Sequence, residues 1–167
     1  MRLCLALLLT ACADPVQHAQ IEALGPEQPK IAKGPLHRAG QPCLTCHDGG
    51  HARAFSIAGT VYAREGEAEP AAGVRVQLSD SAGKQHELAS NCAGNFFVEP
   101  SVYTPVYPLW VTLESGDARI EMDSPIQRDG SCASCHREEA NASSAGPVYL
   151  LPALAPGEIL PPREACP

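Results

Sequence analysis

The sequence predicts a mainly β protein: a small antiparallel β-sandwich over residues 55–123, flanked by two short segments that contain cysteine and histidine, with little helix. Apolar and polar residues alternate along several short runs, which is the period of a strand with one buried face. Turn residues recur about every eight to twelve positions, and the 167 residues include 16 prolines and 14 glycines. This composition favours turns and short strands over long helices.

The expected strands follow one another through the centre of the chain. The first strand is expected over 57–62. The next shows strict alternation of apolar and polar residues over 74–79. The run Asp-Ser-Ala-Gly at 80–83 is a typical turn, so 85–89 is expected to return beside that strand. The remaining expected strands are 95–98, 109–113 and 118–122, and a turn at 115–117 separates the last two.

One five-residue pattern occurs on each side of the expected sandwich. The chain reads Cys-Leu-Thr-Cys-His at 43–47 and Cys-Ala-Ser-Cys-His at 132–136. Both fit C-x-x-C-H, the attachment signature of a c-type haem. Two thiols add to the vinyl groups of one porphyrin, and the following imidazole becomes an iron ligand. The sequence therefore predicts two haem c groups, with covalent attachment at Cys43, Cys46, Cys132 and Cys135 and proximal iron ligands at His47 and His136.

Chance, a zinc ribbon and a pair of disulfides account for the two motifs less well. Composition alone predicts about 0.01 such pentapeptides in a chain of this length, whereas the sequence holds two. A zinc ribbon or a pair of disulfides would also use two C-x-x-C pairs, but neither requires a histidine directly after each pair. The chain then divides into haem segments at 36–54 and 124–140 on either side of the sandwich.

The ligand on the distal side of each iron stays open, with three candidates. His37 lies just upstream of the first motif, on a segment that can fold over a porphyrin. His51 follows His47 so closely that it is better placed to reach the other haem. Met122 lies upstream of the second motif, where a thioether would raise the haem potential relative to two histidines. The alternative roles are surface histidines and a core methionine.

The N-terminus predicts export. The apolar run 3–9 is too short to span a bilayer, and Leu-Thr-Ala-Cys at 9–12 resembles the lipobox of bacterial lipoproteins. That resemblance implies a signal peptide over 1–11 and a lipidated Cys12; the alternative is an ordinary signal peptide cut near Ala13. Residues 12–35 are then expected to be a flexible tether. The expected location is the bacterial cell envelope, lipid-anchored, in the periplasm or at the outer membrane.

Two cysteines, Cys92 and Cys166, are left over. In an oxidising compartment we expect them to pair, which would tie the proline-rich C-terminal strap, 141–167, to the sandwich. Free thiols or intermolecular disulfides are the alternatives. Within the strap, 148–151 is expected either to cover a porphyrin face or to add an edge strand.

Three runs within the sandwich resemble the carboxypeptidase regulatory-like, or transthyretin-like, family. They are Ala-Gly-Thr-Val-Tyr at 58–62, Pro-Ala-Ala-Gly-Val-Arg-Val at 70–76 and Ser-Asn-Cys-Ala-Gly-Asn-Phe at 90–96. They follow the pattern G-x-V, P-x-x-G-x-x-V and T-D-x-x-G-x-F, except that Asn91 and Cys92 replace the usual Thr-Asp. The resemblance implies a β-sandwich without catalytic activity, because such domains are usually accessory modules. The whole chain is similar to dihaem cytochromes with a sandwich between two attachment motifs.

Charge and motifs together predict a function. The net charge of -7 argues against nucleic-acid binding and favours basic partners. The leading hypothesis is a lipid-anchored dihaem cytochrome that transfers single electrons between redox partner proteins, rather than an enzyme. Two alternatives stay open: a haem-based sensor or peroxidase-like enzyme with one open iron, and a surface binding or filament module. In a filament, oligomers would share haem ligands such as His18 or His51.

Overall fold

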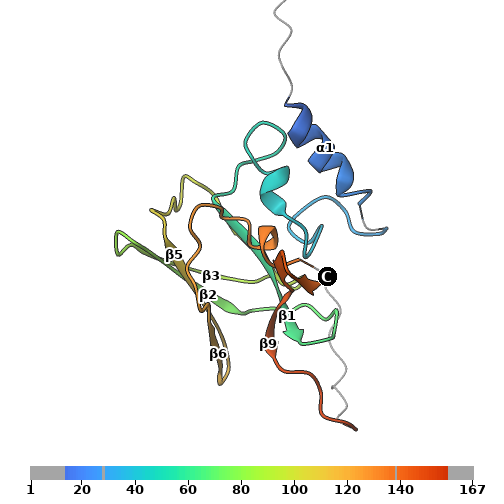
Figure 1. Cartoon of the computed structure of the whole chain (residues 1–167), viewed down its shortest axis with the longest axis vertical. Coiled ribbons are helices and arrows are strands. Elements are labelled where there is room, and N and C mark those ends of the chain that lie inside the picture. Colours follow the sequence, from blue (N-terminus) through green and yellow to red (C-terminus); the bar gives the residue numbers. More distant parts are fainter. Residues whose placement is uncertain (1–13, 28, 138, 158–167) are drawn as a thin grey trace, which may run out of the picture.

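The predicted mainly β architecture is confirmed in a computed structural model, which describes residues 14–27, 29–137 and 139–157 (Figure 1). Strands dominate these residues, and the helical turns are short. The elements in chain order are α1 (Pro15–Ala23), η1 (Cys43–Thr45), β1 (Ile57–Arg64), β2 (Arg75–Asp80), β3 (Gln85–Ala89), β4 (Asn95–Val98), β5 (Leu109–Ser115), β6 (Ala118–Glu121), η2 (Cys132–Ser134), β7 (Ala140–Asn141), β8 (Ser144–Ala145) and β9 (Val148–Leu151).

One sheet has four antiparallel strands in the order β3-β2-β5-β6. Along β2 the predicted alternation is present, because Val76 and Leu78 are buried while Arg75 is exposed. The β5–β6 hairpin turns where the sequence predicted, with Ser115 opposite Ala118. The periodicity of two therefore identified both the strands and their buried face.

The turn between β2 and β3 also lies where Asp-Ser-Ala-Gly predicted it. Asp80 Oδ1 accepts hydrogen bonds from the backbone N–H groups of Ala82 (3.1 Å) and Lys84 (2.9 Å). Gly83 has a φ of 78°, a left-handed conformation that favours glycine. The Asp80 side chain thus stabilises the hairpin turn through these hydrogen bonds.

The second sheet is built around β1, in the order β4-β1-β9. β4 runs antiparallel to β1, with Gly59 opposite Phe96. β9 runs parallel to β1, with Val61 opposite Val148. Residues 148–151 therefore form an edge strand, the second of their two expected roles. This parallel pair departs from an all-antiparallel sandwich, and it is possible because a long crossover separates the two strands in sequence.

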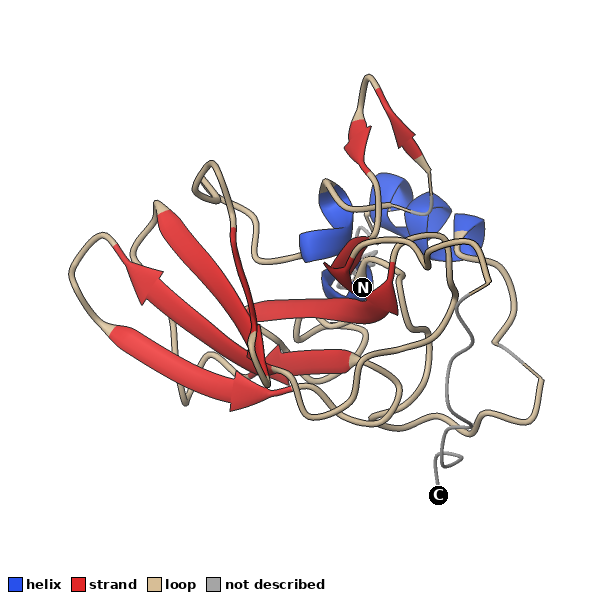
Figure 2. Cartoon of the chain, turned by 90° about the horizontal axis from the view of Figure 1, so that it is seen from below, coloured by secondary structure: helices blue, strands red, loops and turns tan. Residues whose placement is uncertain are grey.

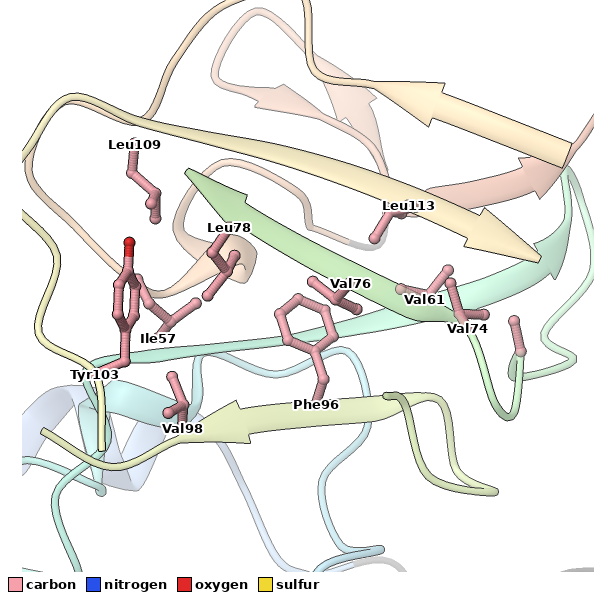
Figure 3. Close-up of a cluster of buried hydrophobic side chains, with 11 residues drawn as sticks. Ile57, Val61, Val74, Val76, Leu78, Phe96, Val98, Tyr103, Leu109 and Leu113 are labelled. Atoms are coloured by element: carbon pink, nitrogen blue, oxygen red, sulfur yellow. The ribbon is translucent and has the colours of Figure 1, made fainter. Parts of the chain in front are cut away.

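A hydrophobic core lies between the two sheets (Figure 3). Side chains from β1, β2, β4 and β5 meet there, and the ring of Tyr103 is fully buried among them. Each fully buried apolar side chain contributes roughly 1.5–3 kcal/mol. The buried cluster consists of Ile57, Val61, Ala71, Val74, Val76, Leu78, Phe96, Val98, Tyr103, Leu109 and Leu113.

Helix α1 lies within 12–35, where the sequence predicted a flexible tether, so the structure differs there. Asp14 Oδ1 accepts hydrogen bonds from the backbone N–H groups of Val16 (2.9 Å) and Gln17 (3.3 Å), and Pro15 occupies the start of the helix. An N-cap aspartate followed by proline is a helix-start signal. The signal was present in the sequence, but the weak apolar periodicity after it hid the helix.

The predictions for the chain termini fall largely outside the described residues. The predicted signal peptide, the predicted lipidation site Cys12 and the end of the strap with Cys166 lie outside the described residues. Cys92 is disulfide-bonded, as expected for one half of its predicted pair. Within the described residues, no helix is both long and apolar enough to cross a membrane.

Candidate cofactor site

The two C-x-x-C-H motifs adopt the same backbone conformation. Each forms a 3-10 turn, η1 or η2, that starts at the first cysteine. In both, the backbone N–H groups of the second cysteine and of the histidine donate to the carbonyl of the first cysteine. The two distances are 3.2 and 2.9 Å at the first motif and 3.1 and 2.8 Å at the second. This winding places two thiols and one imidazole on a single turn of chain.

Each motif histidine is oriented by a backbone carbonyl. The Nδ1 atom of His47 lies 2.8 Å from the Arg53 carbonyl, and the Nδ1 atom of His136 lies 2.9 Å from the Gly146 carbonyl. An imidazole that donates its Nδ1 proton to a carbonyl leaves Nε2 unprotonated, with its lone pair free for a metal. With Nδ1 donating to a carbonyl, both histidines have the tautomer and orientation that a metal ligand needs, which fits the axial ligand of a haem.

Strand β1 holds the segments that lead into both motifs. Before the first motif, the Gly40 N–H donates to Thr60 Oγ1 (2.8 Å). Before the second, the Ala58 N–H donates to the Gly130 carbonyl (2.9 Å). The motifs begin at Cys43 and Cys132, far apart in sequence, yet both depend on one strand. The helical segments are grouped beside the strands (Figure 2).

The two motif turns lie side by side next to β1 and α1 (Figure 1). An open cleft of about 590 Å³ lies between them and α1, and its lining includes residues between the motif cysteines but none of the motif thiols or imidazoles. Gln17 of α1 spans to the first motif, because its Nε2 donates to Asp48 Oδ2 (2.7 Å) and to the Thr45 carbonyl (3.2 Å). The cleft is lined by Asp14, Val16, Gln17, Gln20, Ala23, Leu24, Pro42, Leu44, Thr45, Asp129, Ser131, Ala133, Ser134 and Arg137.

The first thiol of each motif is desolvated. Burial raises the pKa of Cys43 to about 11 and the pKa of Cys132 to about 12, and the neighbouring Cys43 thiol adds to the shift at Cys132. Cys132 packs on Gly59, where a Cβ atom would lie 2.8 Å from its Cβ and Sγ atoms. Both thiols are protonated at neutral pH once the motifs are packed. None of the four motif cysteines is part of a disulfide.

His37 is brought to the first motif. Its ring centroid lies 5.9 Å from that of His47, at an interplanar angle of 79°. The other face of the site is aromatic, because the His47 ring stacks on Phe55 at 4.0 Å and Phe55 stacks on Phe97 at 4.6 Å. Of the three candidate distal ligands, His37 is thus placed beside a proximal histidine.

The other two candidates make different interactions. His51 is 46% exposed, and its Nδ1 lies 3.2 Å from Asp48 Oδ2. Met122 follows β6, where its backbone N–H donates to the Val111 carbonyl (3.1 Å).

Several residues of the site had not been predicted from the sequence. The carbonyls of Arg53 and Gly146 carry no sequence signal, because any residue supplies a carbonyl. Phe55 was visible only as the start of the sandwich. Gln17 could have been suspected only after α1 had been recognised from its Asp-Pro start.

The described residues contain no group of three or more His, Cys, Asp or Glu side chains arranged to hold a metal ion directly. The four motif cysteines are accordingly not gathered into one zinc-ribbon-like set. Comparisons with protein-family models, curated proteins and solved structures found no match to this chain.

Proposed function

We propose that this protein is an exported, lipid-anchored dihaem c-type cytochrome that transfers single electrons between redox partner proteins at the cell envelope. The observation that carries the proposal is the duplicated histidine geometry. Two C-x-x-C-H turns, far apart in sequence, each direct the histidine Nδ1 to a backbone carbonyl at 2.8 and 2.9 Å. A zinc ribbon or a disulfide pair has no need for two such oriented imidazoles.

The haem groups would be held by residues of the two motifs. Cys43 and Cys46 would attach one porphyrin and Cys132 and Cys135 the other, with His47 and His136 as proximal ligands. A bound haem supplies a one-electron Fe(III)/Fe(II) couple, whose potential depends on its axial ligands and burial. The protein's own contribution is to fix the imidazoles, desolvate the attachment side and keep the two motifs adjacent.

The test is expression of the full chain together with haem c maturation machinery, followed by intact mass spectrometry. The expected product carries two covalent haems. The double variant C43S/C46S should lose one, C132S/C135S should lose the other, and C92S should keep both. A chain without covalent haem, or one that loses no haem in either double variant, would overturn the proposal.

The same sample separates electron transfer from ligand chemistry. Two six-coordinate, low-spin haems that do not bind carbon monoxide after reduction are expected of an electron carrier. A high-spin iron that binds carbon monoxide would instead support a sensor or a peroxidase-like enzyme.

A further inference from the structure

We propose that His37 is the second axial ligand of the iron at the first motif, opposite His47, and that the Glu27 carboxylate positions it. This inference rests on the proposed haem attachment. It makes the first haem a bis-histidine centre that is closed to small ligands. It also makes Glu27, which carries no motif signal, part of the cofactor site.

The spacing of the two rings fits a shared metal ion. Two imidazoles that bind one metal ion from opposite sides have centroids about 6 Å apart, since each metal–nitrogen bond is about 2 Å long and each bound nitrogen lies about 1 Å from its ring centroid. The His37 and His47 centroids are 5.9 Å apart. His47 is held in place by the Arg53 carbonyl and by the Phe55 ring, and the His37 ring approaches it edge-on.

Two buried polar atoms next to His47 lack a hydrogen bond. Among the described residues, His37 Nδ1 and Glu27 Oε2 are both buried and both without a hydrogen-bond partner, although they lie only 3.7 Å apart. A small ring rotation would close this gap into a hydrogen bond. Nδ1 would then donate to the carboxylate, and the Nε2 lone pair would be free for iron, as in the carboxylate–histidine–metal arrangement.

The Glu27 carboxylate is itself fixed. Its Oε1 lies 3.2 Å from Arg38 Nε. The Arg38 guanidinium also donates to the Leu24 and Gly25 carbonyls at the end of α1, at 3.3 and 2.8 Å. One arginine thus ties together α1, the glutamate and the chain next to His37, which leaves Oε2 available to the histidine.

The backbone that carries His37 is anchored to the sandwich. The side-chain amide of Asn95, on β4, donates to the carbonyls of Pro35 (3.2 Å) and His37 (3.1 Å). The Asn91 amide donates to the same Pro35 carbonyl at 2.7 Å. A histidine on a segment tied to the sandwich is pre-positioned, and it need not be ordered when the cofactor binds.

A purely structural role for His37, as an ion-pair partner of Glu27, predicts different behaviour. In that case removal of the imidazole would alter stability but leave the iron six-coordinate. The experiment therefore reads the iron's coordination. It uses the full chain carrying haem, with the haem count of every variant checked by intact mass.

The principal variant is His37→Ala, with His86→Ala as the matched control, because His86 lies on β3 in the other sheet and its ring stacks on Tyr103 at 5.2 Å. With two covalent haems still attached, H37A should convert half of the low-spin EPR signal to high-spin and should bind carbon monoxide at one iron after reduction. Added imidazole should restore the low-spin signal. H86A should stay fully low-spin. An H37A protein with two haems that is still entirely low-spin would overturn the proposal.

A second variant guards against poor folding of H37A. His37→Met keeps a ligating side chain, so a thioether–iron charge-transfer band and a higher potential should appear only if residue 37 binds iron. Two intact haems without that band would contradict His37 ligation. If the wild-type chain itself carries no covalent haem, the proposed function fails, and the mass measurement alone reveals that outcome.

Glu27→Gln tests the positioning role. Loss of the carboxylate makes the His37 imidazole a weaker electron donor to the iron. E27Q should therefore remain low-spin, while one of the two haem potentials rises. Glu139→Gln, at an exposed glutamate near the second motif, is the control and should leave both potentials unchanged. An unchanged pair of potentials in E27Q would remove Glu27 from the proposal.

Discussion

At the residue scale, single atoms decide whether the motifs can pack on the sandwich. Gly59 lies in β1 opposite Phe96 in register, and its missing side chain leaves room for Cys132. A Cβ there would lie 2.7 Å from Phe96 Cζ and 2.8 Å from Cys132 Sγ. The position therefore couples the core of the sandwich to the second motif.

Gly59→Ala is expected to destabilise the fold by about 1–3 kcal/mol, because overpacking forces backbone and side-chain shifts. Urea unfolding of the haem-free chain measures this cost. Gly50→Ala is the control, since its Cβ would approach Asp48 Oδ2 only to 3.4 Å. Equal stability of G59A and G50A would show that the strand yields at little cost.

A second residue-scale prediction concerns pH. Burial alone would raise the pKa of Asp80, but backbone N–H groups of Val106, Lys84 and Ala82 donate to its carboxylate and hold the pKa below its usual value. A lowered folded-state pKa stabilises the fold above the unfolded value of about 3.9, and this contribution is lost as pH falls below it.

Asp80→Asn should therefore lower the free energy of unfolding at neutral pH. It should also reduce the further loss of stability as the pH falls to acid values. Unfolding free energies measured at a series of pH values from neutral to acid would show both effects. Glu67→Gln, at an exposed glutamate in a loop, should leave the curve unchanged. An acid limb that is as steep in D80N as in the wild type would contradict the assignment.

At the element scale, the strands and the two motif turns could be predicted from the sequence, but the identity of the strand that holds both motifs could not. The alternation over 74–79 and the turn at 80–83 follow from local chemistry. By contrast, the side-by-side placement of the motifs depends on β1, whose neighbours β4 and β9 come from distant parts of the chain. The carbonyls that orient His47 and His136 have no residue preference, so no sequence pattern could have revealed them.

The segment between α1 and the first motif depends on Asn95. Its side chain is buried: Oδ1 accepts from Thr60 Oγ1 (2.7 Å), and Thr60 Oγ1 in turn accepts from the Gly40 N–H (2.8 Å). Because removal of one partner leaves buried groups unsatisfied, Asn95→Ala should cost about 1–3 kcal/mol.

That variant should also speed hydrogen exchange at the Gly40 amide, which native-state exchange with NMR detection can follow. Exposed Asn141→Ala is the control and should leave Gly40 exchange unchanged. Slow Gly40 exchange in N95A would mean that the segment is held independently of β4.

At the scale of the whole molecule, charge is the property that a redox partner meets first. The chain carries a net charge of -7, and haem propionates would add to it. Two arginines near the first motif are offset by ion pairs, Arg38 with Glu27 at 3.2 Å and Arg53 with Glu99 at 2.8 Å. The field around the proposed first haem should therefore be negative, as the net charge suggests.

A negative field predicts opposite salt effects for small redox reagents of opposite charge. Electron exchange with a cationic complex should slow as ionic strength rises, and exchange with an anionic complex should accelerate, because salt screens both attraction and repulsion. Stopped-flow rates at several salt concentrations measure the two slopes. Arg53→Gln should steepen both, since it leaves the Glu99 charge unpaired. If the anionic reagent were the faster one at low salt, a local cluster of basic side chains would control access to the haems, and the partner would be acidic instead of basic.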